Sequence, residues 1–302
     1  MPEQILKTID LGKKYRKTEA LGGIDLTVCR GDIYGLIGRN GAGKTTFLKI
    51  IGGLIPDYDG SYELFGKSGR EATVSRIRMG CLIDSPAFFP NFSAYQNLKY
   101  YCVQKGITDN DKIVKILETV GLGYTGMKKY KTFSLGMKQR LGIAFALLDD
   151  PEFVILDEPI NGLDPMGISD MRNLFLRLNR ENNVTFIISS HILSELYSVA
   201  NKFLIIDRGR IIREISKDEL DRECKRGVNI VCDDVKTACV IIENELGISD
   251  FVIADDRSLN VYSEIETSVL TRLLVNNDID VYRITQTGVS LEEFYRNLIG
   301  EK

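Results

Sequence analysis

The first third of the chain alternates short apolar runs with turns, a pattern typical of β-strands. Strands are predicted at residues 4–10, 24–29, 33–37 and 61–65. Between the last two runs, apolar residues recur at helical spacing and predict an amphipathic helix that begins at Lys44 and stops at Gly52, Gly53 and Pro56. The apolar positions of this helix are Phe47, Leu48, Ile51 and Leu54. This part of the chain is therefore predicted as strands packed around one helix.

Residues 85–150 differ from the segments on either side, because they show helical spacing and no clear strand run. One example is the apolar set Ile113, Ile116, Leu117 and Val120. After residue 150 strands are predicted again, at 153–156, 184–189 and 203–206. The economical interpretation is an α/β fold with a mainly parallel sheet, an antiparallel β part and a helical insertion at about 85–150.

The last eighty or so residues have a pattern of their own. Strands are predicted at 228–232, 251–254, 258–262 and 280–284, and helices at 235–246, 267–276 and 291–298. This order, β-α-β-β-α-β with a closing helix, indicates a small α+β module. Dense charges from Lys217 to Arg226 favour a boundary there. We therefore predict two domains, at residues 1–218 and 219–302.

Bulk composition narrows the class of protein. Of the 302 residues, 39 are basic and 42 acidic, and the formal net charge of −3 gives no support for a nucleic-acid-binding surface. No apolar run approaches the ~18 residues that a membrane span needs. The start of the chain lacks the pattern of a signal peptide. The six cysteines include no Cys-x-x-Cys pair, which favours free thiols and a cytoplasmic protein.

A phosphate-binding loop follows the predicted strand at 33–37. Residues 38–46 have the sequence Gly-Arg-Asn-Gly-Ala-Gly-Lys-Thr-Thr, which is the P-loop pattern between a strand and a helix. Backbone N–H groups of such a loop and the helix N-terminus bind phosphate oxygens. Lys44 is expected to reach the β- and γ-phosphates, Thr45 to bind Mg²⁺ and Thr46 to contact the α-phosphate. The predicted nucleotide-binding residues are Gly38, Asn40, Gly41, Ala42, Gly43, Lys44, Thr45 and Thr46.

Two acids end the apolar strand at 153–156. Ligands of open α/β sheets bind at the carboxyl ends of the strands, so Asp157 is predicted beside the P-loop as a Mg²⁺ ligand, directly or through water. Glu158 is predicted as the general base for a water that attacks the γ-phosphate, with Lys44 as a further catalytic residue. Strand alternation implies that the two acids need not point at the same atom.

Ser134 is a good N-cap for a helix that continues through Leu141 and Leu148. Taken alone, this is an ordinary capped helix. Its position, 90 residues after Lys44 and 23 before Asp157, makes a functional role for this helix more plausible than a purely structural one.

With these motifs, residues 1 to about 218 resemble an ABC-transporter ATP-binding subunit. Residues 133–137 match the family's five-residue signature, usually Leu-Ser-Gly-Gly-Gln. Ser134 and Gly136 are retained and are expected to contact ATP, whereas Phe133, Leu135 and Met137 depart from the pattern.

The resemblance implies further residue roles. Residues 161–164 correspond to a loop that communicates between two sites. His191, the single histidine, corresponds to a catalytic residue that contacts the γ-phosphate and helps position the water. Tyr15 matches the aromatic residue that stacks on adenine, with a plain surface tyrosine as the alternative. Where the family normally has glutamine, this chain has Asp84, followed by Ser85 and Pro86. Aspartate is shorter and charged, and Asp84 is predicted as a ligand of Mg²⁺ or water.

The acidic residue at this place and the aromatics beyond it resemble exporters of the bacitracin-resistance and lantibiotic-immunity type. Two readings of the aromatics remain open, a groove for a membrane-subunit helix or packing inside the insertion. These residues are Phe88, Phe89, Phe92 and Tyr95.

By family resemblance, two copies would clamp two ATP molecules between them and act with a separately encoded membrane permease, peripheral on the inner face of the cell membrane. The alternative is a soluble ABC-type ATPase or a regulatory nucleotide-binding subunit that takes no part in transport.

Overall fold

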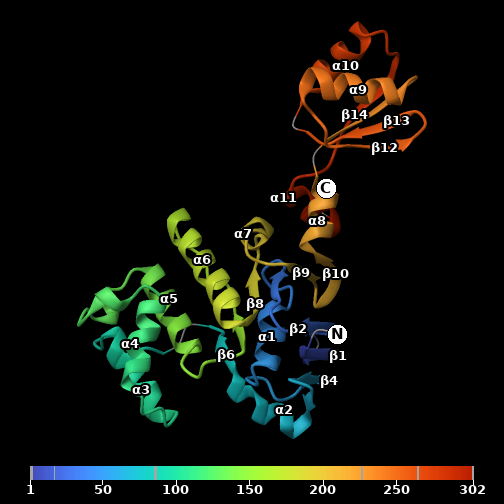
Figure 1. Ribbon diagram of the computed structural model, residues 1–302. Coiled ribbons are helices and arrows are strands. Elements are labelled where there is room, and N and C mark those ends of the chain that lie inside the picture. The colour runs from blue at the N-terminus through green and yellow to red at the C-terminus, as the bar shows by residue number, and fades with distance from the viewer. Residues whose placement is uncertain (1–2, 17, 85–86, 226, 264, 301–302) are drawn as a thin grey trace. The chain divides into compact units, whose positions relative to one another are not determined.

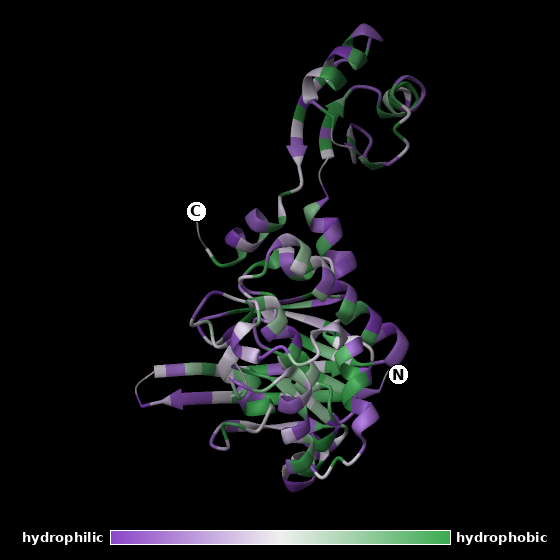
Figure 2. Ribbon diagram, turned by 90° about the vertical axis from the view of Figure 1, so that its left-hand side faces the viewer, coloured by the Kyte–Doolittle hydropathy of each residue, from purple (hydrophilic) through white to green (hydrophobic). Residues whose placement is uncertain are grey.

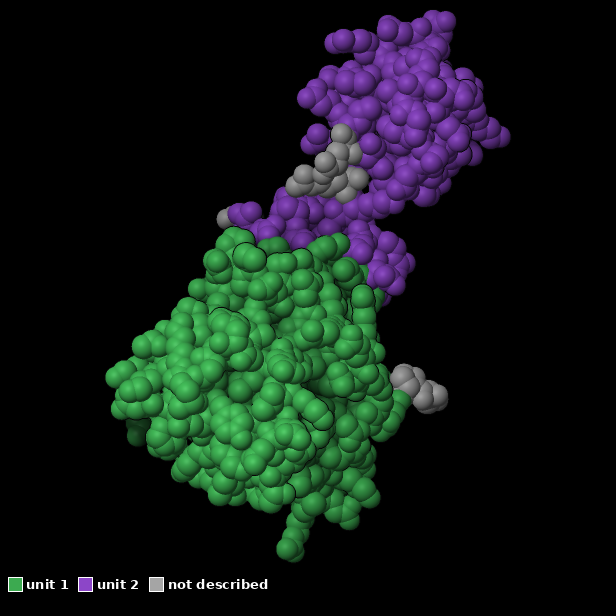
Figure 3. All heavy atoms as spheres, turned by 60° about the vertical axis from the view of Figure 1, so that its left-hand side comes forward, with its two compact units in different colours: residues 1–217 green, residues 218–302 purple. Residues whose placement is uncertain are grey.

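The computed structural model describes residues 3–16, 18–84, 87–225, 227–263 and 265–300. Ser85 and Pro86, beside the predicted departure at Asp84, lie outside the described residues. The chain divides into two compact units, Met1–Lys217 and Asp218–Lys302 (Figure 3). Each unit is described by itself.

The first unit is built on a six-stranded, mainly parallel sheet (Figure 1). Its strands, in spatial order, are β10 (Arg210–Ser216), β9 (Lys202–Asp207), β3 (Ile33–Ile37), β8 (Thr185–Ser190), β7 (Phe153–Leu156) and β6 (Met79–Leu82). Every residue of β3, β7 and β8 is buried, as expected for central parallel strands covered on both faces. The predicted parallel sheet is confirmed, and β10, which pairs antiparallel with β9, was not predicted.

A second, antiparallel sheet covers one face of the first. Its strands, in spatial order, are β2 (Thr18–Cys29), β1 (Gln4–Tyr15), β4 (Asp59–Leu64) and β5 (Lys67–Ser68). Helix α1 (Lys44–Ile51) shares one apolar core with both sheets, through residues such as Phe47 and Leu48. Helix α1 stops at the glycines, as predicted, but the inclusion of Leu54 among its apolar positions is wrong, because Leu54 lies beyond the end of α1 and is 61% exposed.

The other face of the central sheet packs against α6 (Pro165–Asn182) and α7 (Leu193–Tyr197). The rings of Phe175 on α6 and Phe186 on β8 lie 5.8 Å apart, and both are buried. The central sheet therefore lies between α1 with the antiparallel sheet on one side and α6 with α7 on the other. Hydrophobic positions gather along its strands (Figure 2).

The predicted helical insertion is confirmed between β6 and β7. Helix α2 (Gly69–Ser75) and the 3₁₀ turn Arg76–Arg78 precede β6, and the insertion follows β6. Its elements are α3 (Ala94–Gln104), α4 (Asn110–Thr119), two 3₁₀ turns at Gly123–Thr125 and Tyr130–Thr132, and α5 (Leu135–Ala146). The three α-helices begin after the N-caps Ser93, Asp109 and Ser134, whose side chains accept backbone hydrogen bonds.

The second unit contains an antiparallel sheet and all of helix α8 (Lys217–Cys224) except its first residue. Its other elements, in chain order, are β11 (Gly227–Cys232), α9 (Val235–Leu246), β12 (Phe251–Asp255), β13 (Ser258–Val261), α10 (Thr267–Asn276), β14 (Val281–Thr287) and α11 (Leu291–Leu298). The sheet order is β12-β13-β11-β14. Along β11, Val228, Ile230 and Cys232 are buried in a core shared with α9 and α10. The α+β character predicted for this segment is confirmed.

None of the helices in the described part of the chain combines the length and apolarity that crossing a membrane requires.

Charged residues form a cluster near the start of β7. Glu152 lies 2.5 Å from Arg78 and 2.7 Å from Arg30, measured between side-chain nitrogen and oxygen atoms. Arg30 also pairs with Glu3 at 2.7 Å. Hydrogen bonds from Arg78 and Arg30 lower the pKa of Glu152 from its ordinary 4.5 to about 2. The cluster connects the segments ahead of β1, β6 and β7.

Because the pKa of Glu152 is lowered by folding, its stabilising effect is present above pH of about 4.5 and is lost as the pH falls toward about 2. We expect Glu152→Gln to lower the free energy of unfolding by about 1 kcal/mol at neutral pH, since the group is partly exposed. The loss should shrink as the pH falls, measured by denaturant unfolding at several pH values. An equal loss at all pH values would contradict this role.

Candidate functional site

The loop between β3 and α1 surrounds a cavity of about 230 Å³. The cavity is lined by Ala20, Arg39, Asn40, Gly41, Ala42, Gly43, Lys44, Thr45, Thr46 and Glu158. All the predicted P-loop residues except Gly38 are therefore in its wall. The positive end of α1, an eight-residue helix, begins at the same place, which suits an anionic ligand.

Two glycines of the loop are required for different reasons. Gly43 has a φ of 110°, and a Cβ there would lie 2.7 Å from the carbonyl oxygen of Ala20. Gly38 has no positive φ, but a Cβ there would lie 2.5 Å from the carbonyl oxygen of Ile206 on β9. The sequence argument assigned both glycines to the phosphate, whereas packing against neighbouring backbone also demands them.

Lys44 is 5% exposed and its ammonium group lies inside the loop. Its Nζ donates a hydrogen bond to the Gly38 carbonyl oxygen at 2.5 Å and lies 3.2 Å from Oε1 of Glu158. The lysine therefore both supports the loop and neutralises an acid from the end of β7. A buried ammonium beside backbone N–H groups can bind phosphate oxygens.

Asp157 lies against the first turn of α1. Its Oδ2 accepts a hydrogen bond from Thr45 Oγ1 at 2.7 Å, and its Oδ1 accepts one from Ser189 Oγ at 2.5 Å. A hydroxyl and a carboxylate in contact are oxygen ligands of the kind that Mg²⁺ prefers. No cluster of three or more His, Cys, Asp or Glu suited to a metal occurs among the described residues. The pair therefore suits an ion that also takes phosphate and water oxygens.

Glu158 directly follows Asp157, but it lies beyond the end of β7 and has a φ of 49°. Strand alternation therefore does not set its direction; the left-handed backbone does. Its Oε2 lies 2.9 Å from Nδ1 of His191, which follows β8. Its Oε1 is buried and receives no hydrogen bond from the described residues. The Lys44 ammonium, 3.2 Å away, is the ion-pair partner of this oxygen, and Glu158 is part of the wall of the P-loop cavity, where a water or a ligand hydroxyl can donate to its carboxylate.

Asp84 lies nearby with a different partner. Its Oδ2 is 2.7 Å from Nζ of Lys49 on α1, and its φ is 59°. A cavity of about 150 Å³ has Asp84, Asp157 and Glu158 in its wall, together with residues of α5. The structure thus brings Asp84 to the same edge as the two acids while pairing it with a lysine that the sequence argument had not considered.

Three predicted nucleotide contacts lie elsewhere. Ser134 caps α5 by accepting the N–H of Met137 at 3.3 Å, and it is exposed. Neither Ser134 nor Gly136 is among the described residues that line the P-loop cavity. Tyr15 ends β1 and is 46% exposed, with the Lys13 ammonium 5.2 Å from its ring centroid.

Sequence reasoning missed Ser189 and Arg39. Ser189 was treated only as part of an apolar strand. A hydroxyl in such a strand is buried and therefore needs a hydrogen-bond partner, which was the available signal. Arg39 lines the P-loop cavity and its guanidinium lies 3.1 Å from Asp207. Arg39 lies between Gly38 and Asn40 of the P-loop, and this position could have indicated that it lines the site.

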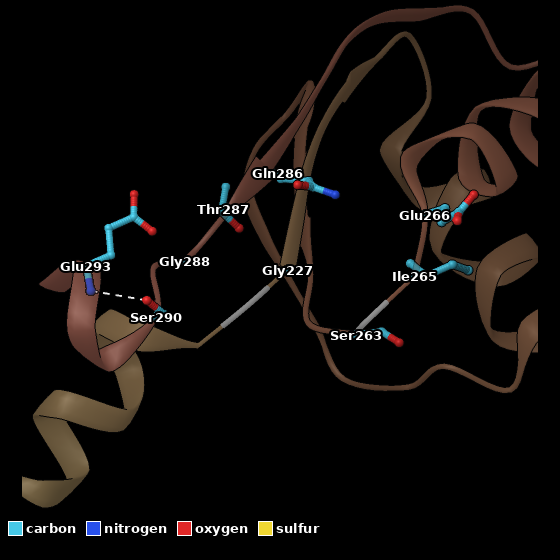
Figure 4. A pocket seen from close by; sticks show the side chains of 9 residues that line it. All are labelled: Gly227, Ser263, Ile265, Glu266, Gln286, Thr287, Gly288, Ser290 and Glu293. Carbon is cyan, nitrogen blue, oxygen red and sulfur yellow. Dashed lines mark hydrogen bonds between the residues drawn. The ribbon is translucent and has the colours of Figure 1, made fainter. Parts of the chain in front are cut away.

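A further cavity, of about 480 Å³, lies in the second unit (Figure 4). Its wall is formed by Gly227, Ser263, Ile265, Glu266, Gln286, Thr287, Gly288, Ser290 and Glu293. Ser290 accepts the backbone N–H of Glu293 at 3.1 Å as the N-cap of α11. None of the predicted site residues belongs to this wall.

Comparison with known proteins decides the family. A protein-family profile described as ABC transporter matches residues 21–161. The bacitracin transport ATP-binding protein BcrA of Bacillus licheniformis is 41% identical over 300 residues, covering 98% of this chain and 97% of that protein. The chain belongs to the ABC transporter ATP-binding proteins. The resemblance inferred from the motifs is confirmed.

Two further relatives of this ABC transporter ATP-binding protein are informative. The lantibiotic transport ATP-binding protein SrtF of Streptococcus pyogenes is 41% identical over 214 residues, covering 71% of this chain and 92% of that protein. The solved structure of cbiO1 from Clostridium perfringens, part of the ABC transporter complex cbiONQ, aligns with a TM-score of 0.65 at 28% identity. It covers 73% of this chain and 92% of that chain. The ABC transporter ATP-binding protein binds and hydrolyses ATP, and subunits of this kind work with separate membrane subunits.

We expect Lys44→Ala to weaken ATP binding by about 10- to 100-fold, because a charge-assisted hydrogen bond is worth about 1.5–3 kcal/mol. Isothermal titration calorimetry measures the change. The exposed Lys115 on α4 provides the control Lys115→Ala, which should bind like the wild type. Unchanged affinity in Lys44→Ala would contradict the P-loop assignment.

Proposed function

We propose that this chain powers the export of a peptide antibiotic, or another amphipathic compound, through a separately encoded membrane permease. The observation that carries the proposal is similarity over 98% of the chain to a bacitracin transport ATP-binding protein. The similarity to a lantibiotic transport protein, over 214 residues, points to the same class of cargo. An ABC-type ATPase or regulatory subunit outside transport is the alternative.

The site residues take the following proposed roles. Lys44 and the loop N–H groups, with Asn40, Ala42 and Thr46 in the cavity wall, bind the phosphates. Thr45 and Asp157 hold Mg²⁺, and Asp84, which lines a cavity together with Asp157, contributes an oxygen or a water. Mg²⁺ supplies charge neutralisation at the phosphates. Glu158 accepts the proton of the attacking water, and His191, 2.9 Å from its Oε2, orients that carboxylate.

Hydrolysis is proposed to require a second copy of the chain. The P-loop supplies donors from one side, whereas charge that develops during phosphoryl transfer needs donors around it. Ser134 is exposed at the N-terminus of α5 and lies outside the P-loop cavity of its own chain. In a two-fold dimer, Ser134 and Gly136 would complete the site of the other copy, with Tyr15 stacking on the adenine.

An exposed aromatic surface on the insertion is the proposed contact with the permease. Phe89 and Phe92 are each 38% exposed, with ring centroids 4.9 Å apart, and the ring of Tyr100 lies 4.8 Å from Phe89. Phe88 instead packs inside the insertion against Phe145 and neighbouring rings and is 7% exposed. The exposure of Phe89 and Phe92 supports the groove reading for these two residues, and the burial of Phe88 supports packing inside the insertion. The proposed location is the inner face of the cell membrane.

We further propose that residues 1–218 form the ATP-binding domain and residues 219–302 an accessory module. The lantibiotic transport relative aligns over 214 residues of this chain and over 92% of its own length. A transport ATP-binding protein can thus consist almost entirely of a segment as long as the first unit, which makes the second unit an addition.

We expect Glu158→Gln to reduce the ATPase rate by about 10²–10⁴-fold, because the attacking water loses its base while the phosphate donors remain. The variant should retain ATP and shift toward dimer in size-exclusion chromatography with ATP. Glu118→Gln, at an exposed position of α4, is the control and should keep the wild-type rate. Loss of turnover without any gain of dimer would contradict the two-copy site.

We expect the double substitution Phe89→Ser and Phe92→Ser to abolish co-purification with a membrane protein encoded beside this chain. ATP binding by the isolated chain should not change, since neither residue lines the P-loop cavity. Tyr124→Ser, which alters a tyrosine 77% exposed on the same insertion, is the control. Co-purification that survives the double substitution would show that the permease binds elsewhere.

A further inference from the structure

We propose that Ser189 is the positioning residue that orients both acids of the ATPase site. The proposal rests on the proposed roles of Asp157 and Glu158 and adds a residue that neither a motif nor a relative assigned. Ser189 lies on β8, between β3 and β7 in the sheet, and is completely buried. Its hydroxyl is therefore available only to groups at this edge of the sheet.

The hydroxyl makes two hydrogen bonds of opposite sense. Ser189 Oγ accepts the backbone N–H of Glu158 at 2.8 Å and donates to Oδ1 of Asp157 at 2.5 Å. A serine hydroxyl has a single proton, which this arrangement commits to Asp157. One side chain thereby connects the backbone of the proposed base to the carboxylate of the proposed metal ligand.

This bond determines how the Asp157 carboxylate is turned. With Oδ1 bound by Ser189, the other oxygen, Oδ2, accepts the hydroxyl of Thr45 at 2.7 Å. Two hydroxyls from β8 and α1 therefore hold the carboxylate from both ends. Partners behind a metal ligand fix its orientation in this way, and their loss typically weakens metal binding or activity by about 10- to 100-fold.

The second bond stabilises an unfavourable backbone conformation. Glu158 has a φ of 49°, a region that a side-chain-bearing residue rarely occupies without support. The bond from its N–H to Ser189 is one such support, and it follows directly after the end of β7. In this conformation the Glu158 carboxylate reaches both His191 and Lys44. Ser189 thus helps the two adjacent acids to point in different directions, Asp157 toward Thr45 and Glu158 toward His191 and Lys44.

Removal of the hydroxyl leaves two groups without their partner. In Ser189→Ala the Glu158 N–H and Asp157 Oδ1 both lose a bond inside the protein, and a buried backbone donor is costly to leave unpaired. Ser189→Thr keeps the hydroxyl and suits a β-strand. The pair of variants separates the effect of the hydroxyl from that of the site's shape.

A matched control exists on the same strand. Thr185 begins β8, is also completely buried, and its Oγ1 accepts a backbone N–H, that of Gly31, at 2.9 Å. Thr185→Val removes an equivalent buried acceptor at the opposite end of the strand. It reports the general effect of losing such a bond without touching either acid.

The test measures Mn²⁺ affinity in the presence of ADP by electron paramagnetic resonance, and kcat and KM for ATP at several Mg²⁺ concentrations. We expect Ser189→Ala to weaken Mn²⁺ binding and to lower kcat by about 10- to 100-fold, with KM for ATP within about threefold of the wild type. Ser189→Thr and Thr185→Val should stay close to the wild type in both measurements.

Three results would overturn the proposal. The first is wild-type Mn²⁺ affinity in Ser189→Ala, the second an equal loss in Thr185→Val, and the third a Ser189→Thr protein as weak as Ser189→Ala. A wild-type protein that binds Mn²⁺ with ADP but hydrolyses no ATP contradicts the proposed function instead. Metal affinity then still decides the role of Ser189, because it needs no turnover.

Discussion

Parallel pairing of β3, β8 and β7 is the constraint on which the site depends. Ile37 pairs with Ser190 and Leu156 with Ile188, so the three strands end at the same edge of the sheet. Residues that follow adjacent parallel strands must then meet, which brings together the P-loop, His191 and the two acids. Both faces of these strands are buried, so a shift by one residue would exchange the side chains of the two faces and disturb the packing on each.

At that edge the protein concentrates polar groups that the core cannot satisfy. Lys44 is buried against carbonyl oxygens and Glu158, and Asp157 is held between two hydroxyls. Glu158 adopts a left-handed backbone and has one oxygen that receives no hydrogen bond among the described residues. Strain and unmet hydrogen bonds of this kind are typical of sites prepared for a ligand. The ion pair of Lys44 and Glu158 thus lies where phosphate is proposed to bind, beside the left-handed backbone of the proposed base.

The two units differ in what they bring to function. The first carries the P-loop, both acids, the histidine and the signature helix, and it corresponds in length to the aligned part of the lantibiotic transport relative. The second has an antiparallel sheet, its own apolar core and a cavity lined mainly by polar residues. The bacitracin transport relative aligns over both. A proposed accessory role for the second unit agrees with a site whose parts within this chain all lie in the first.

The sequence by itself determined the P-loop, the acid pair and most of the elements, because each is encoded in local spacing. In the second unit α9, α10 and α11 begin and end at the predicted residues. Local spacing failed at Leu54, which lies beyond the glycines where the helix was predicted to stop, and at β10, for which no strand was predicted. Only the tertiary structure decided that Ser189 connects the two acids, that Lys49 pairs with Asp84, and that Gly38 must clear β9. Such contacts join residues far apart in the chain, and their partners are chosen by which strands become neighbours in the sheet.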